Sequence, residues 1–165
     1  MVIPNQYLTS VLAITPEWCR AQGKTTLLLD LDNTLMPRDT RRITPDIKAW
    51  YEGMQAAGIK MVLVSNSWHH QCYDVARYLG SDIIAKSIKP LPFAFLAALK
   101  KAGSKRSESI VVGDQLFTDV LGATLLGMTS VMVKPLVTYD LGHTLLLRHV
   151  ERWYLGARSA LDEPS

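Results

Sequence analysis

Short runs of apolar, β-favouring residues alternate along this chain with segments in which apolar residues recur at helical spacing. The first clear run, residues 26–31, is apolar on both faces, as a central strand of a parallel sheet should be. Four more strands are expected, at residues 60–65, 82–85, 109–113 and 129–133. The sequence therefore predicts an α/β fold: a mostly parallel five-stranded sheet with helices on both faces, arranged as a Rossmann-like three-layer sandwich.

The helices expected between these strands have recognisable starts. Thr44 and Pro45 supply an N-cap and a proline at the first helical position. A second helix should follow strand 60–65 directly, and a third, from Pro92, should turn Leu96 and Leu99 toward the core. Two more helices are expected, at residues 116–126 and 145–155.

Length and composition limit the class of protein. A chain of 165 residues can bury one continuous core, and we expect residues 1–165 to form a single domain. No apolar run approaches the roughly 18 residues that span a bilayer, and the N-terminus lacks a signal-peptide pattern. Cys19 and Cys72 have neither metal-ligand spacing nor a disulfide framework, so we expect free thiols and a cytoplasmic location. The net charge of +3 permits attraction to phosphate or anionic lipid, and no nucleic-acid partner is expected.

Polar residues follow the ends of four predicted strands. Ligands of open α/β sheets bind outside the carboxyl ends of the strands, where such residues meet. The groups are Asp30-Leu31-Asp32-Asn33-Thr34 after the first strand, Ser65-Asn66-Ser67 after the second, Lys89-Pro90 beyond the third, and Gly113-Asp114 with Asp119 after the fourth.

The order of these groups suits phosphoryl transfer. Asp30 and Asp32 flank one residue, so both can face one site from the turn after the strand. The Asp30 carboxylate could attack phosphorus and form an aspartyl-phosphate. Asp32 could give a proton to the leaving oxygen and then take one from the attacking water. The phosphoryl oxygens would be bound by Lys89, which we count among the catalytic residues, and by Thr34, Ser65 and Asn66.

Three carboxylates in one place repel each other unless a cation joins them. Mg²⁺ is the usual hard, oxygen-binding cation beside phosphate. We expect Asp30 and Asp114 to bind it directly, and Asp119 to bind it directly or through a water molecule.

Each signal also has an ordinary structural explanation. Paired aspartates in loops are usually caps or turn residues, and a single lysine such as Lys89 is usually solvated. Ser65 could be a helix N-cap, and Asp114 and Asp119 could cap the helix that begins near residue 116. The order, the spacing and the position at successive strand ends favour the catalytic interpretation.

These segments resemble the four motifs of the haloacid dehalogenase superfamily. The resemblance implies the superfamily's Rossmann-like sheet, aspartyl-phosphate chemistry and Mg²⁺, and we expect the backbone carbonyl of Asp32 among the metal ligands. The motifs are matched by Asp30-Leu31-Asp32-Asn33-Thr34-Leu35, Val64-Ser65-Asn66, Lys89-Pro90 and the segment from Gly113 to Asp119.

A closer resemblance extends over nearly the whole chain, to class IIIA-type phosphatases that include bacterial relatives of mitochondrial and plastid phosphatidylglycerophosphate phosphatases. It is carried by residues 10–17, by Gly113 through Gly122, and by Glu151-Arg152. The resemblance implies removal of the terminal phosphate of phosphatidylglycerophosphate. Ser67 departs from the pattern, because relatives commonly carry a second asparagine there.

Only about twenty-five residues separate the first motif from strand 60–65, too few for a separate cap domain. An uncovered site suits a phosphate carried on a large object, such as a lipid headgroup or a phosphoprotein. A phosphatase for a soluble phosphomonoester or a phosphoprotein is the second candidate. A non-catalytic binding or assembly protein is the third, and the intact set of Asp30, Asp32, Lys89 and Asp114 argues against it.

Several segments could contact a membrane peripherally at its inner face. The loop with Arg38, Arg41 and Arg42 could hold a second phosphate or an anionic lipid, or could simply be solvated. His69 and His70 open a predicted helix and are expected as first-turn residues rather than ligands. Two further segments either reach a membrane or pack in the core: Arg148, Arg152, Trp153, Tyr154 and Arg158 near the C-terminus, and Tyr7, Leu8, Val11, Leu12 and Trp18 at roughly helical spacing near the N-terminus.

Overall fold

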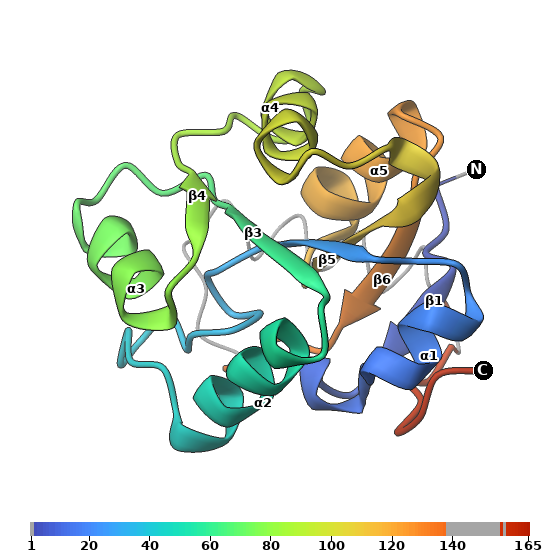
Figure 1. Ribbon diagram of the computed structural model, residues 1–165, viewed down its shortest axis with the longest axis horizontal. Coiled ribbons are helices and arrows are strands. Elements are labelled where there is room, and N and C mark those ends of the chain that lie inside the picture. Colours follow the sequence, from blue (N-terminus) through green and yellow to red (C-terminus); the bar gives the residue numbers. More distant parts are fainter. Residues whose placement is uncertain (1, 138–155, 157) are drawn as a thin grey trace.

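The computed structural model describes residues 2–137, 156 and 158–165. One sheet has the strand order β1-β6-β5-β2-β3-β4, and every pairing is parallel (Figure 1). The predicted parallel α/β class is confirmed, with one strand more than expected. The strands are β1 (Gln6–Leu8), β2 (Thr26–Leu29), β3 (Lys60–Val64), β4 (Asp82–Ile84), β5 (Ser109–Gly113) and β6 (Thr129–Val133).

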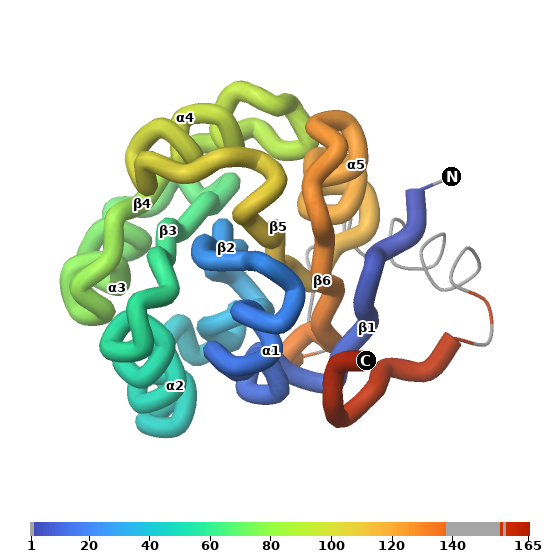
Figure 2. The backbone as a smooth tube through the Cα atoms, turned by 45° about the vertical axis from the view of Figure 1, so that its right-hand side comes forward, coloured from blue at the N-terminus to red at the C-terminus, as the bar shows by residue number. Residues whose placement is uncertain are grey.

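Helices cover both faces of this sheet. The elements are α1 (Pro16–Ala21), α2 (Pro45–Ala56), α3 (Gln71–Leu79), α4 (Phe93–Ala102) and α5 (Leu121–Leu125), with short turns η1 (Val11–Ala13), η2 (Arg106–Glu108) and η3 (Leu116–Val120). Residues of α1, α2 and α3 pack in one core cluster, and residues of α4 and α5 pack in another. Figures 1 and 2 show α1 and α2 on the side of the sheet opposite α4 and α5.

Strand β2 contributes to both cores, which explains its continuous apolar run. Leu27 and Leu29 pack with the α1–α3 layer, whereas Leu28 packs with α4 and α5. Successive side chains of a strand point to opposite faces, so a strand between two helical layers must be apolar throughout. The central strand is therefore fixed in the middle of the sandwich, and its carboxyl end is held firmly.

The N-terminal segment differs from its predicted helical pattern. Residues Gln6–Leu8 form β1, which pairs with β6 and supplies the sixth strand. A strand of three residues is too short to show the two-residue period of a strand in the sequence. The helical pattern predicted for Tyr7 and Leu8 is therefore wrong. The first α-helix starts later, at Pro16, where the Thr15 hydroxyl accepts the Trp18 N–H at 3.1 Å. The C-terminal segment runs beside β1, with the Thr9 N–H donating to the Leu161 carbonyl at 2.8 Å (Figure 2).

Three helix predictions also need correction. Leu96 was expected to face the core but is 37% exposed, because α4 buries the stripe that contains Phe95 and Leu99 instead. Helix α3 begins at Gln71 rather than directly after β3, so Ser65 is not its N-cap. The helix expected at 116–126 opens with a wide π-helical turn, η3, before α5. The helix predicted at 145–155, with Arg148, Arg152, Trp153 and Tyr154, lies outside the described residues.

Among the residues that the structure describes, no cap is inserted at the carboxyl edge of the sheet. Between β2 and β3 the chain forms only a turn and α2, as the short spacing predicted. Within the described part of the chain, no helix has both the length and the apolar character needed to cross a membrane.

Candidate active site

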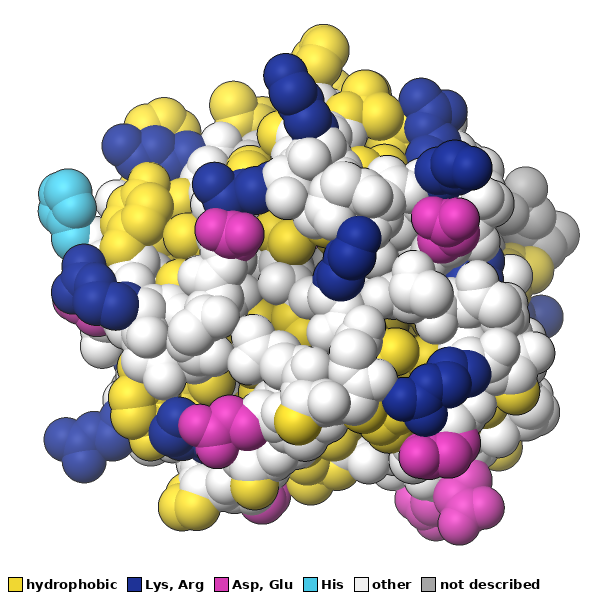
Figure 3. All heavy atoms as spheres, in the orientation of Figure 1, with side chains coloured by type: hydrophobic (Ala, Val, Ile, Leu, Met, Phe, Trp, Pro, Cys, Tyr) yellow, Lys and Arg dark blue, Asp and Glu magenta, His cyan; other side chains and the backbone are white. Residues whose placement is uncertain are grey.

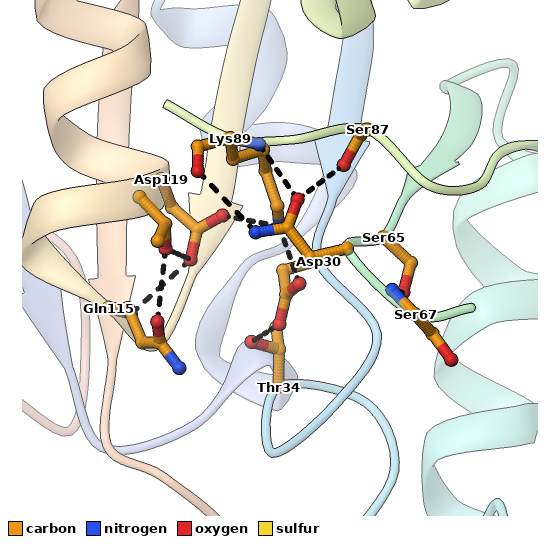
Figure 4. A network of polar contacts seen from close by, with 10 residues as sticks. Asp30, Thr34, Ser65, Ser67, Ser87, Lys89, Gln115 and Asp119 are labelled. Carbon is orange, nitrogen blue, oxygen red and sulfur yellow. Dashed lines mark hydrogen bonds and ion pairs between the residues drawn. The ribbon is translucent and has the colours of Figure 1, made fainter. Parts of the chain in front are cut away.

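Asp30 lies immediately after the central strand β2. Its N–H donates to the Val112 carbonyl of β5 at 2.8 Å, which fixes the backbone at this point. The side chain is nearly buried, with the residue 8% exposed. The Thr34 hydroxyl donates to Asp30 Oδ2 at 3.0 Å, and Lys89 Nζ donates to Oδ1 at 2.6 Å (Figure 4). Both carboxylate oxygens of the predicted nucleophile are therefore oriented by neighbours.

The turn after Asp30 depends on Asn33, which the sequence argument did not single out. Asn33 has a φ of +65°, a left-handed conformation that asparagine tolerates better than most residues. Its N–H donates to the Met36 carbonyl at 2.7 Å, and its side-chain oxygen accepts the Arg38 N–H at 3.2 Å. This tight turn places Thr34 beside Asp30, where its hydroxyl donates to the carboxylate. An asparagine directly after two spaced aspartates was the signal that could have identified it.

Lys89 is buried between two carboxylates, contrary to the solvated alternative. Its Nζ donates to Asp30 Oδ1 at 2.6 Å and to Asp119 Oδ1 at 2.7 Å. Burial alone would lower the pKa of Lys89, but the charges of Asp119 and Asp30 outweigh this and raise the pKa above its ordinary value. Lys89 therefore remains a cation at neutral pH.

Asn66 holds the loop that carries Lys89. Its side-chain oxygen accepts the Ser87 hydroxyl and the Lys89 N–H, each at 2.8 Å. The predicted role of Asn66 in binding phosphate stays a prediction, and its amide oxygen is occupied by this loop. Ser65 ends β3, and its fully buried hydroxyl accepts the Ser67 N–H at 3.1 Å. That bond leaves the hydroxyl proton of Ser65 available for an acceptor.

Three buried carboxylates converge at the edge of the sheet. Asp30, Asp114 and Asp119 each offer one oxygen, and these oxygens lie within 4.8 Å of one another. Oδ2 of Asp119 accepts the Gln115 N–H at 3.3 Å. Asp119 lies inside η3, whose N-cap position is Gln115 without a side-chain cap, so it does not take the capping role. Burial raises the pKa of Asp119, Lys89 opposes the rise, and Asp30 adds to it.

Gly113 makes room for this cluster. A Cβ on Gly113 would lie 2.2 Å from the carboxyl carbon of Asp119, a distance that real Cβ atoms essentially never show. The last residue of β5 must therefore be glycine if Asp119 is to keep this position. The resulting set consists of carboxylate oxygens, which are the ligands that hard divalent cations such as Mg²⁺ prefer. The residues present fit such a cation.

Asp32 faces different surroundings from Asp30. It is half-buried and lines a cavity of about 530 Å³ together with Arg38, Arg41, Trp68 and other residues. Burial raises the pKa of Asp32, the Asp30 charge raises it further, and Arg38 and Arg41 partly oppose the rise. A carboxyl group with a raised pKa retains a proton more readily, as a general acid requires.

The structure brings together most of the predicted site. Asp30, Thr34, Lys89, Asp114 and Asp119 form the buried group, and Figure 4 shows Asp30 between Asp119 on one side and Ser65 on the other. The remaining residues are more peripheral. His69 lines the cavity, His70 precedes α3, and Arg42 is exposed and does not line the cavity. Cys19 and Cys72 are free and buried, as expected.

The chain is similar to known proteins in sequence and in fold. A family model described as haloacid dehalogenase-like hydrolase matches residues 6–127. "Probable phosphatase YqeG" of Bacillus subtilis (strain 168) is 35% identical over 155 residues, which cover 94% of this chain and 90% of that protein. The crystal structure of a HAD phosphatase from Thermococcus onnurineus is 26% identical, with a TM-score of 0.52, over 71% of this chain and 60% of that chain.

A more distant structure shares the fold alone. The cobalt-bound deoxy-D-mannose-octulosonate 8-phosphate phosphatase (YrbI) from Haemophilus influenzae is 12% identical to this chain. Its TM-score is 0.55, and the match covers 81% of this chain and 88% of that one.

Proposed function

Because this chain belongs to the haloacid dehalogenase-like hydrolases, we propose that it hydrolyses phosphate monoesters through an aspartyl-phosphate on Asp30, with phosphatidylglycerophosphate as its substrate. The observation that carries the chemistry is the pair of aspartates on one turn. Asp30 is nearly buried between Thr34 and Lys89, whereas Asp32 opens onto the cavity. This contrast supports the assignment of Asp30 as the nucleophile and of Asp32 as the acid.

Two displacements follow from this arrangement. In the first, Asp30 attacks phosphorus, the bond from phosphorus to the alcohol oxygen breaks, and Asp32 donates a proton to that oxygen. In the second, Asp32 takes a proton from a water molecule that attacks phosphorus, and the bond to Asp30 breaks. Lys89 balances charge at the nucleophile, while the Ser65 hydroxyl and the Asn66 side-chain N–H groups donate to the phosphoryl oxygens. The Thr34 hydroxyl, which donates to Asp30 before substrate binds, turns to a phosphoryl oxygen once Asp30 has attacked.

The proposed metal site uses Asp30, Asp114, Asp119 and the backbone carbonyl of Asp32. When bound there, Mg²⁺ would neutralise charge on the phosphoryl oxygens. Support comes from the oxygen-only donor set and from the charge balance of the buried group. Within this group three carboxylates share one ammonium, so the group's own charge is −2 when all are ionised. A divalent cation balances this charge.

An exposed apolar rim beside the cavity supports a lipid substrate. The rim consists of Trp68 after β3, which also lines the cavity, of Ile88 and Leu91 on the loop after β4, and of Phe93 at the start of α4. Trp68 is 68% exposed and Phe93 is 72% exposed. The Lys86 ammonium lies 5.1 Å from the centre of the Trp68 ring, so a cation accompanies the aromatic group.

Such a combination fits the surface of an anionic bilayer, where large apolar side chains enter the headgroup region and cations meet lipid phosphates. Figure 3 shows apolar side chains interspersed with Lys and Arg side chains along the upper margin of the molecule, in the region of α4. The edge of the sheet is compatible with this approach, because between β2 and β3 the chain forms only the catalytic turn and α2, with no inserted cap.

The experiment for the substrate is phosphate release from a panel. The panel spans phosphatidylglycerophosphate in micelles, phosphatidic acid, nucleotides, sugar phosphates and phosphopeptides. We expect the largest kcat/KM for phosphatidylglycerophosphate, with activity lost in chelator, restored by Mg²⁺ and poorly supported by Ca²⁺, which takes a looser and higher coordination. A soluble phosphomonoester or a phosphopeptide at the head of the ranking would replace the lipid assignment with the second candidate.

The rim is tested separately with vesicles that contain anionic phosphatidylglycerol. The double variant Trp68→Ser, Phe93→Ser should bind these vesicles less than wild type in a sedimentation assay. Leu125→Ser is the matched control, because Leu125 is 61% exposed but ends α5, away from the carboxyl edge of the sheet. Equal binding by all three proteins would contradict the proposed membrane contact.

A further inference from the structure

We propose that Arg38 and Arg41 form a second anion-binding site, which recognises an acidic group on the alcohol that leaves from the scissile phosphate. The site rests on the proposed function in one respect: the cavity beside Asp32 is taken to hold the leaving alcohol. Its ligand is a second phosphate or phosphodiester within reach of the first. From the sequence, the loop with Arg38, Arg41 and Arg42 could be either an anion site or a solvated loop. In the structure, Arg38 and Arg41 line the cavity and Arg42 does not.

The first observation is the shared cavity. Arg38 and Arg41 line the same cavity of about 530 Å³ as Asp32, and both guanidinium charges act on the Asp32 carboxylate. Both residues are half-buried, whereas Arg42 is exposed and does not line the cavity. Two of the three arginines therefore face the space in which the leaving group would lie.

The second observation is the conformation of the loop. The Arg41 N–H donates to the Pro37 carbonyl at 2.8 Å, which closes a turn and brings the two arginines to one side. Arg41 has a φ of +51°, a left-handed conformation that residues with a Cβ adopt uncommonly and at some energetic cost. The Arg38 N–H is tied to the Asn33 side chain, so the loop is anchored to the catalytic turn itself.

The third observation is the availability of donors. Within residues 2–137, 156 and 158–165, no hydrogen bond or ion pair involves the guanidinium group of Arg41. A guanidinium group offers a planar fork of N–H donors that matches two oxygens of a phosphate. A half-buried fork in a cavity is partly shielded from competing water, which strengthens its interaction with an anion.

The position of the site determines which part of the substrate it recognises. The scissile phosphate must lie beside Asp30, where Lys89 and Thr34 are held. Arg38 and Arg41 lie on the Asp32 side, where the leaving oxygen receives its proton. The second anion must therefore belong to the leaving alcohol. The phosphodiester of a lipid headgroup and that of a soluble compound offer the same chemistry.

The experiment compares three substrates. Glycerol 3-phosphate has no second anion on its leaving group. The deacylated headgroup, glycerophosphoglycerol phosphate, carries a phosphodiester and remains soluble, and phosphatidylglycerophosphate in micelles adds the acyl chains. All three release an alkyl alcohol, so each needs the Asp32 proton on its departing oxygen to a similar degree. The ratio of kcat/KM for the deacylated headgroup to kcat/KM for glycerol 3-phosphate measures how much the second anion contributes to substrate recognition.

We expect this ratio to be about 10- to 100-fold in wild type, as for one or two charge-assisted hydrogen bonds. Arg38→Gln and Arg41→Gln should each lower it roughly tenfold, chiefly through KM. Arg42→Gln is the matched control, with the same change on the same loop but outside the cavity, and should leave the ratio at the wild-type value. Arg41→Lys keeps the charge without the fork and should fall between, which also covers a glutamine variant that fails to fold.

A wild-type ratio near one, or an equal fall in Arg42→Gln, would overturn the second site. The results with phosphatidylglycerophosphate and with its deacylated headgroup distinguish failure of the second site from failure of the proposed function. Hydrolysis of phosphatidylglycerophosphate with no preference for the second anion leaves the function standing without this site. A preference for the soluble diester that depends on Arg38 and Arg41, with no hydrolysis of the lipid, keeps the site and assigns it to a soluble substrate.

Discussion

The buried group around Asp30 and the outer cavity around Asp32 differ in how their charges are satisfied. In the buried group, Lys89 contacts Asp30 and Asp119 within 2.7 Å, and all these residues are nearly inaccessible. In the outer cavity, Trp68 is largely exposed and Asp32 is half-buried. The buried group is thus arranged before substrate arrives, as electrostatic catalysis requires, while the outer cavity keeps groups available for the substrate.

The difference implies a division of labour. Changes in the buried group should damage the reaction with every substrate, because each substrate brings the same phosphoryl group there. Changes in the outer cavity should alter which leaving group is accepted. The predictions below test this division.

The largest effect is expected from Asp30→Asn. The amide cannot act as the nucleophile, so kcat should fall by about 10⁴-fold or more with every substrate, while the fold is retained. Steady-state phosphate release measures the loss, and circular dichroism verifies the fold. Near-normal turnover by this variant would exclude Asp30 as the nucleophile.

The next effect is expected from Asp32→Asn and should depend on the leaving group. Alkyl phosphates need a proton on the departing oxygen, and their phosphorylation step should slow by roughly 10³-fold. p-Nitrophenolate scarcely needs protonation, so its loss should be much smaller. Single-turnover kinetics with both esters measure the two losses. If they are equal, Asp32 is not the acid and the two aspartates do not differ as described.

Gly113→Ala should reduce activity by about 10²-fold, because the new methyl group displaces Asp119 from the carboxylate cluster. The matched control is Gly53→Ala in α2, where an added Cβ meets nothing within 4 Å. That control should keep full activity and gain up to about 1 kcal/mol of stability from better helix propensity. Equal activity of the two variants would show that the position of Asp119 is unimportant.

Mg²⁺ should stabilise the protein, since its two positive charges balance the net charge of −2 on the buried group of three carboxylates and one ammonium. At about one hundred times its Kd, the free energy of unfolding should rise by roughly 2.7 kcal/mol. For a chain of this size the Tm should rise by about 5–10 °C. Asp114→Asn should lose most of this shift, whereas Arg42→Gln, outside the cavity, should keep it. Thermal unfolding with and without Mg²⁺ gives the result, and an unchanged Tm in wild type would argue against a metal in this group.

The sequence predicted the layers of the fold because they depend on local patterns. Leu27, Leu28 and Leu29 had to be buried on both faces, and Thr44-Pro45 correctly started α2. Strand β1 was missed because its three residues have no period of their own and are fixed by pairing with β6. The prediction for Leu96 was wrong because the helical spacing of apolar residues is compatible with burial of either of two adjacent faces of α4.

The sequence was sufficient to predict which residues form the site, but not which contacts they make. Residues at strand ends identified Asp30, Lys89 and Asp114, because parallel strands bring such positions together. The hydrogen bond that Asn66 accepts from the Lys89 N–H joins positions 23 residues apart, and the close approach of Gly113 to Asp119 spans a turn. The separation of Arg41 from Arg42 depends on the left-handed backbone at Arg41. None of these has a local sequence pattern.

The most direct test of the account is the mass of the Asp30 peptide after reaction. Asp32→Asn removes the base for the second displacement, so this variant should accumulate the aspartyl-phosphate when mixed with p-nitrophenyl phosphate and Mg²⁺. Rapid acid quench, proteolysis and mass spectrometry should then find one phosphoryl group on the peptide that contains Asp30, and none in the Asp30→Asn, Asp32→Asn double variant. Phosphate release without a labelled Asp30 peptide, or with the label on another residue such as Ser65, would contradict the account.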